Sequence, residues 1–130
     1  MTLARAGAGR NTKSVMVNKI YKLKIRAVDR GVFDAIKSGR KKIETRAAIE
    51  NYRKIKKGDT VIFVCEGKKI KRKVVNVALY KDIGVLFKNY KIKDVFPSLK
   101  KISEVRKMYY SFPNYREKIK KFGPIILKLK

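Results

Sequence analysis

The best candidate for a functional site is the run G-x-K-x-x-E-x-R, which occupies residues 39–46. It brings a lysine, a carboxylate and a forked guanidinium close together as Lys41, Glu44 and Arg46. Successive side chains of a strand point to opposite faces, so a strand here would put Lys42, Glu44 and Arg46 on one face. A carboxylate beside a guanidinium can bind a planar polar ligand such as a nucleobase, or a phosphodiester. The alternative is a purely structural Glu44–Arg46 ion pair at a sheet edge.

The pattern on either side of this run predicts the elements that position it. Residues 20–26 largely alternate apolar and basic side chains, which is typical of a half-buried strand. Asp29 is predicted to cap the following helix, which Gly39 ends. Asp82 is predicted to cap a second helix, and a third is predicted over residues 102–112. Strands are further predicted over residues 42–46, 60–65, 70–80 and 124–129, with a loop or short helix over 47–57 and a short turn over 92–96. This order of strands and helices favours an α+β fold around a small, strongly curved sheet or barrel.

The charge of the chain narrows the class of partner. The 130 residues carry 36 Lys and Arg against 10 Asp and Glu, a formal net charge of +26. Such a field attracts polyanions, among which nucleic acid is the most common in a cell. A lysine-rich composition that reflects AT-rich codons is the alternative. No apolar run is long enough to cross a bilayer, so we expect no membrane partner.

Composition also predicts the domain organisation. Residues 1–14 are mostly Ala, Gly and Arg without hydrophobic periodicity, which predicts a disordered basic tail over residues 1–17. Residues 18–130 then form one folded domain. The single Cys65 lies in an apolar run and is expected to be a buried free thiol, which suits a reducing cytoplasm.

Four blocks of the sequence resemble the ASCH domain, a member of the PUA-like superfamily. They are Val32–Gly39, the G-x-K-x-x-E-x-R run, Arg53–Asp59 leading into the strand that follows, and Lys121–Ile126. The resemblance implies a PUA-like β-barrel of about five to six strands with flanking helices. It also implies an RNA-binding cleft beside the G-x-K-x-x-E-x-R run.

By this resemblance Lys41, Glu44 and Arg46 would line the cleft. Arg46 would hold a phosphate or base edge, Glu44 would accept from an exocyclic amine, and Lys41 would supply a point charge. The surrounding electrostatic field would come from further basic residues, namely Arg53, Lys71, Arg72 and Lys73. The run 68–73 that holds three of them is otherwise typical of a solvated hairpin.

A small hydrolase is the competing hypothesis, because some ASCH-like proteins resemble N(4)-acetylcytidine amidohydrolases. In that pattern Lys41 matches the catalytic lysine, but Glu44 stands where a threonine is expected, and residues 96–99 hold no carboxylate. If the chain were a hydrolase, Lys41 and Glu44 would be its catalytic residues. The chain has no histidine to transfer protons near neutral pH. Cys65 lies within a predicted core strand and has no histidine partner, so we do not expect a thiol nucleophile.

We therefore expect an RNA-binding module rather than an enzyme. No metal or other cofactor is expected, because carboxylates are few and scattered and no Cys or His cluster exists. A basic accessory protein of a nucleoprotein particle, without a specific cleft, is a third possibility. The oligomeric state and the RNA itself stay open.

The aromatic residues near the C-terminus divide into two groups. Tyr109 and Phe112 continue a helical apolar stripe and are expected to pack in the core. Tyr110 and Tyr115 fall off that stripe and are the better candidates for stacking on bases.

Overall fold

A computed structural model describes residues 18–130, so the predicted tail over residues 1–17 lies outside the described residues. The fold is α+β, as predicted, and contains one five-stranded mixed sheet with strand order β1-β3-β4-β5-β2. The strands are β1 (Ile20–Lys24), β2 (Ile43–Ala47), β3 (Thr60–Cys65), β4 (Lys68–Leu79) and β5 (Pro124–Leu129). The helices are α1 (Arg30–Ser38), α2 (Glu50–Arg53), α3 (Ile83–Asn89), α4 (Ile92–Val95), α5 (Ile102–Tyr110) and α6 (Tyr115–Phe122), with a 3₁₀ turn, η2 (Ala27–Asp29), before α1.

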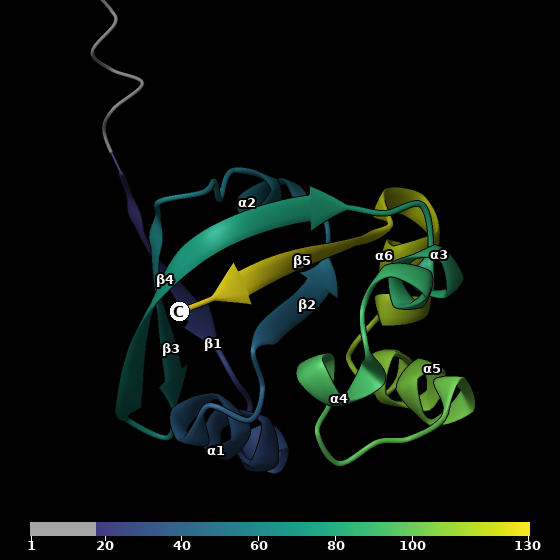
Figure 1. Cartoon of the computed structure of the whole chain (residues 1–130), viewed down its shortest axis with the longest axis horizontal. Helices are drawn as coiled ribbons and strands as arrows, with labels where there is room; N and C mark the ends of the chain where they lie inside the picture. Colours follow the sequence, from purple (N-terminus) through teal and green to yellow (C-terminus); the bar gives the residue numbers. More distant parts are fainter. Residues whose placement is uncertain (1–17) are drawn as a thin grey trace, which may run out of the picture.

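Strand β4 joins the two halves of the sheet. Its first half pairs antiparallel with β3, and its second half pairs antiparallel with β5. The register of β4 against β5 shifts between Val74 and Asn76, an irregularity that bends a strand. The bend turns the β5–β2 half of the sheet away from the β3–β1 half, as the long arrow of β4 shows (Figure 1).

The sheet does not close into a barrel, so the expected closed barrel is wrong. Strands β1 and β2 are the two edges, and no ladder of hydrogen bonds joins them in the described residues. A side chain links the two edges instead. Arg46 of β2 donates from Nη2 to the carbonyl of Lys24 at the end of β1, over 3.0 Å. The functional site described below lies at this gap.

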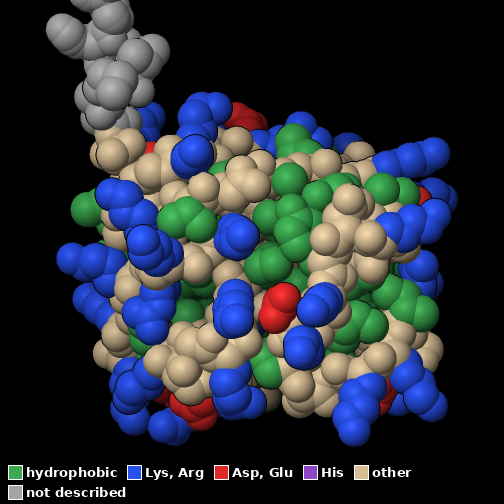
Figure 2. Space-filling view, viewed as in Figure 1, with side chains coloured by type: hydrophobic (Ala, Val, Ile, Leu, Met, Phe, Trp, Pro, Cys, Tyr) green, Lys and Arg blue, Asp and Glu red, His purple; other side chains and the backbone are tan. Residues whose placement is uncertain are grey.

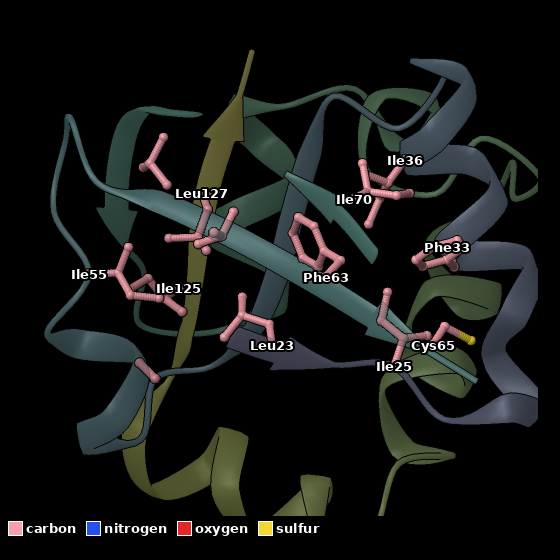
Figure 3. Close-up of a cluster of buried hydrophobic side chains, with 13 residues drawn as sticks. Leu23, Ile25, Phe33, Ile36, Ile55, Phe63, Cys65, Ile70, Ile125 and Leu127 are labelled. Atoms are coloured by element: carbon pink, nitrogen blue, oxygen red, sulfur yellow. The ribbon is translucent and has the colours of Figure 1, made fainter. Parts of the chain in front are cut away.

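Two apolar clusters hold the sheet from opposite faces. The inner cluster fills the concave face, where side chains of β1, β3, β4, β5 and α1 point toward one another (Figure 3). Its members include Leu23, Phe63 and Leu127, and the buried free thiol of Cys65, which confirms that prediction. The helical cluster lies on the other face of β2 and β5, beneath α3–α6, which Figure 1 shows gathered on one side.

The side chains of strand β2 alternate between the two faces of the sheet. Ile43 and Ala47 are buried in the helical cluster, and Thr45 shares a hydrogen bond with the hydroxyl of Tyr109 on that face. Glu44 and Arg46 face the other way, opposite Leu127 and Ile125 of β5. The strand parity expected from the sequence therefore holds for Glu44 and Arg46.

The predicted helix ends agree with the structure in two cases and disagree in one. Gly39 ends α1 with φ at 83°, a left-handed conformation that glycine adopts without steric cost. Asp82 caps α3, because its carboxylate accepts from the amide of Val85 over 2.9 Å. Asp29 occupies the N-cap position of α1 but makes no cap hydrogen bond, since its carboxylate accepts from Nε of Arg26 over 2.8 Å.

Helix α6 was not predicted. It follows Pro113 and Asn114. Ile119 is its only buried residue, so apolar residues do not recur at the spacing that predicts a helix. No helix over residues 18–130 has the length and the apolar character that crossing a bilayer requires.

Candidate functional site

A pocket of about 150 Å³ opens at the gap between the edge strands β1 and β2. Glu44, Thr45 and Arg46 of β2 line it, and we call this part of the lining the floor. The walls come from segments far apart in the sequence: Lys24, Ile25, Arg26, Asp29, Val32, Phe96, Phe112, Pro113 and Tyr115. The curved sheet therefore places a carboxylate and a guanidinium at the base of an opening that reaches solvent.

Two residues of the floor, Glu44 and Arg46, belong to an ion triad in which the carboxylate of Glu44 lies between Arg46 and Lys41. Glu44 accepts from Nε of Arg46 over 3.0 Å, and its other oxygen lies 3.4 Å from Nζ of Lys41. The amide of Thr45 also donates to the carboxylate over 3.1 Å. All three charged side chains are largely withdrawn from water, with 1% of Lys41, 6% of Glu44 and 12% of Arg46 exposed. Two cations and one carboxylate leave the triad with an excess of positive charge, which favours an anionic or electron-rich ligand.

The ionisation of Glu44 is set by these neighbours. Burial opposes its charged form, but the two cations and the donated hydrogen bonds outweigh burial and hold the pKa of Glu44 below its ordinary value. Burial lowers the pKa of Lys41, although the Glu44 carboxylate acts against that change. The Glu44 carboxylate is therefore a permanent acceptor at neutral pH.

The guanidinium of Arg46 keeps donors for a ligand. It donates to Glu44, to the hydroxyl of Tyr52 over 3.0 Å, and to the carbonyl of Lys24 over 3.0 Å. A guanidinium carries five N–H donors. Two donors of Arg46 thus have no partner among residues 18–130, and they belong to a group that lines the pocket.

Aromatic rings form much of the wall. Phe112 and Tyr115 pack edge to face with centroids 5.1 Å apart, and the guanidinium of Arg26 lies 5.2 Å above the Phe112 ring. Phe96 completes the wall, and Lys41 lies 4.6 Å above its ring. Such a mixture of rings and cations suits a flat, electron-rich ligand.

Lys41 borders a second pocket instead of the first. Its ammonium group donates to the carbonyl of Val95 and pairs with Glu44, so both interactions lie inside the protein. The side chain lines a neighbouring pocket of about 230 Å³ between α1 and the segment around Phe96, which borders both pockets. The structure therefore brings Lys41 into contact with Glu44 but does not make it a free point charge in the cleft of Arg46.

The other predicted basic residues lie outside the pocket lining. Arg53 donates to the carbonyls of Ala48 and Phe122, and Arg72 donates to the carbonyls of Ile36 and Lys37 at the end of α1. Both guanidinium groups thus stabilise local backbone. Lys71 and Lys73 are exposed on β4, and the contribution of all four residues to an RNA-attracting field stays a prediction.

The sequence-based prediction was wrong for one residue of the pocket wall, and it did not include several others. Phe112 was expected in the core, but α5 ends at Tyr110, so the helical spacing no longer applies and Phe112 turns toward the pocket. Tyr109 is fully buried, as expected, and Tyr115 lines the pocket while Tyr110 does not. Lys24, Arg26 and Phe96 carried no signal as site residues, because their contact with β2 depends on the fold.

In residues 18–130, His, Cys, Asp and Glu side chains do not gather in threes as a metal site would require. No family model matches the chain, and no curated protein matches it.

Two solved structures are similar to the chain over most of its length. The crystal structure of hypothetical protein PH0355 shares 32% identity, covers 88% of this chain and 98% of that protein, and superposes with a TM-score of 0.71. The solution NMR structure of Protein PF0455 from Pyrococcus furiosus shares 27% identity over 88% of this chain and 96% of that one, with a TM-score of 0.65. Neither name states an activity, so the chemistry of the site has to indicate the ligand.

Proposed function

We propose that this chain, which belongs to the same family as the hypothetical protein PH0355, is an RNA-binding module of the ASCH type, and the chemistry of its pocket supports this proposal. The pocket between β1 and β2 takes one unstacked base of a single strand. The observation that carries this proposal is the combination of a carboxylate and a guanidinium on the floor with aromatic rings on the wall.

The size of the pocket supports a single ring as the occupant. A cavity of about 150 Å³ accommodates a molecule the size of benzene, and the volume here is about 150 Å³. A drug-sized ligand needs about 300 Å³ or more. The pocket therefore suits one base, whose sugar and phosphate stay outside.

The chemistry of the walls matches how proteins read single-stranded RNA. Unstacked bases are stacked on aromatic side chains or on guanidinium planes and hydrogen-bonded at their edges. Phe112 and Tyr115 offer rings, Arg46 offers two donors and Glu44 offers an acceptor. Lys24 and Arg26 at the rim, in a chain of net charge +26, suit the phosphates on either side of the base.

A second candidate is a small hydrolase acting on RNA or on a modified nucleoside such as N(4)-acetylcytidine. The observation that favours it is the burial of Lys41, which lowers the pKa of this amine beside Glu44. A lysine with a lowered pKa can act as a base or a nucleophile. Its ammonium group, however, is held by Val95 and Glu44 and does not line the pocket of Arg46.

One pair of assays tests the proposal against this candidate. Fluorescence anisotropy with a labelled oligouridine of about twelve nucleotides is expected to show binding. The affinity should fall steeply between about 50 and 200 mM salt, because phosphate contacts release counterions. Incubation with the same RNA and with N(4)-acetylcytidine is expected to leave both intact. Turnover by the wild-type protein that is lost in Lys41→Met would support the hydrolase instead.

A further inference from the structure

A lysine-rich surface lies on the outer face of the half-sheet formed by β1, β3 and β4. We call it the lysine face and define it by five exposed residues: Lys22 and Lys24 of β1, and Lys69, Lys71 and Lys73 of β4. The strand register aligns them, since Lys22 and Lys71 both pair with Ile62, and Lys24 and Lys69 both pair with Val64. Two rows of lysines therefore flank the half-buried side chains of β3.

No acidic residue balances these charges. The sequences of β1, β3 and β4 contain no Asp or Glu, and none of the five lysines makes an ion pair within residues 18–130. Lysines two residues apart in a strand are about 7 Å apart, which is within the screening length of about 8 Å at physiological salt. Their mutual repulsion therefore costs stability when no polyanion is bound.

Protection of a sheet edge explains only part of this pattern. Lysines on an edge strand prevent unwanted pairing with another chain, and β1 is such an edge. Strand β4 pairs with β3 over residues 68–73 and with β5 from Val74 onward, so β5 does not cover the stretch that carries the lysines. Protection of an edge does not explain why the lysines of β1 and β4 lie in register on either side of β3, with no acidic side chain on the strand between them.

We propose that the lysine face binds the phosphate backbone of a single RNA strand whose base enters the pocket between β1 and β2. The two sites adjoin at Lys24, which belongs to the lysine face and also lines the pocket. Lysine is a point charge on a flexible stem, so rows of lysines can follow phosphates without requiring a base sequence. In Figure 2 a dense group of Lys and Arg side chains follows the edge of the molecule where Figure 1 places β3 and the start of β4. This inference rests on the proposed function and extends it from one base to a path along the strand.

The test compares two triple variants that remove the same charge. One carries Lys22→Gln, Lys69→Gln and Lys71→Gln on the lysine face, and leaves Lys24 of the pocket intact. The control carries Lys88→Gln, Lys107→Gln and Lys120→Gln, three exposed lysines on α3, α5 and α6. Anisotropy with labelled oligouridine is measured for each protein over a range of salt concentrations.

The lysine-face variant is expected to show a shallower dependence of log affinity on log salt. Because each phosphate contact in a single strand contributes about 0.7 to this slope, the three changes should reduce it by about 2. The control variant should keep the wild-type slope to within a few tenths. Equal changes in both triple variants would overturn the inference, because a general field would then explain the binding.

The same titrations separate this inference from the proposed function. Phe112→Ala should weaken binding without changing the slope, because a ring contacts no phosphate. If Phe112→Ala weakens binding and the two triple variants have the same salt dependence, the lysine face is refuted and the pocket is supported. If the lysine-face variant shows a shallower dependence of log affinity on log salt and Phe112→Ala binds as the wild type does, the lysine face is supported and the pocket is refuted. Failure of the wild-type protein to bind oligouridine would refute both.

Discussion

Glu44→Ala is expected to lower the free energy of unfolding by about 3–5 kcal/mol. The carboxylate lies between Lys41 and Arg46, and both cations are almost fully withdrawn from water. Removing one partner of a buried ion pair leaves an uncompensated charge, and here two cations would lose the only carboxylate contact that they have within residues 18–130. Urea denaturation followed by circular dichroism measures the change.

Glu117→Ala provides the control, because this exposed carboxylate lies in the first turn of α6 and makes no ion pair among residues 18–130. Its loss should cost no more than about 1 kcal/mol. An equally small loss for Glu44→Ala would show that the triad is not a buried ionic unit, and the description of the pocket floor would fail.

The pH dependence of stability reports on the same carboxylate. The pKa of Glu44 is lower in the folded protein than its ordinary value, because of Lys41 and Arg46. Its contribution is therefore complete above the unfolded-state pKa of about 4.3 and is lost as the pH falls through the lower folded value. The wild-type urea midpoint should fall more steeply below this pH than that of Glu44→Gln, which has no carboxylate to protonate.

Phe112→Ala is expected to weaken binding of single-stranded RNA by roughly 5- to 150-fold, which corresponds to about 1–3 kcal/mol for a stacked base. Phe112 is half-buried, lies after the end of α5 and contacts Tyr115 and Arg26 across the pocket wall. It belongs to neither apolar cluster, so the fold should survive its truncation. Anisotropy with labelled oligouridine measures the affinity.

Tyr110→Ala is the matched control for this experiment. Tyr110 is a half-buried aromatic residue two positions earlier, and its ring stacks with Arg116 at 4.1 Å outside the pocket. Its truncation should leave the affinity within about twofold, as expected when no base contact is lost. Equal losses in both variants would indicate general destabilisation rather than a base-stacking site.

Arg46→Ala is a poor substitute for Phe112→Ala, although Arg46 is the more obvious site residue. Its guanidinium holds Glu44, the hydroxyl of Tyr52 and the carbonyl of Lys24, so it connects the two edge strands. Truncation would break a buried ion pair and disturb the fold. A loss of binding would then not report on the ligand.

Local patterns in the sequence were sufficient for most strands and for the floor of the site. Alternation placed Glu44 and Arg46 on one face of β2, and the bounds of β3 and β5 agree with the predicted ranges. Lys42 was expected on the same face, but β2 begins at Ile43, so strand parity does not apply to it and it is exposed. Periodicity failed where an element is short, as in α6 with its single buried residue.

The walls of the pocket could not be predicted, because they depend on contacts between distant segments. Phe96 and Phe112 reach the pocket only because α4 packs on β2 and α5 ends at Tyr110. The sequence also could not predict that Lys41 and Arg46 of the G-x-K-x-x-E-x-R run line different pockets. Lys41 precedes the strand and turns toward Val95, so it lines the neighbouring pocket while Arg46 lines the first.

The most direct measurement is ultraviolet crosslinking of the protein to an oligouridine that contains 4-thiouridine, followed by mass spectrometry of tryptic peptides. A base in the pocket would lie against Phe112 and Tyr115, which share the tryptic peptide Met108–Arg116. We expect the adduct on this peptide at one of these two rings, and its loss when unlabelled RNA competes. Adducts found only outside the residues that line the pocket would contradict the account.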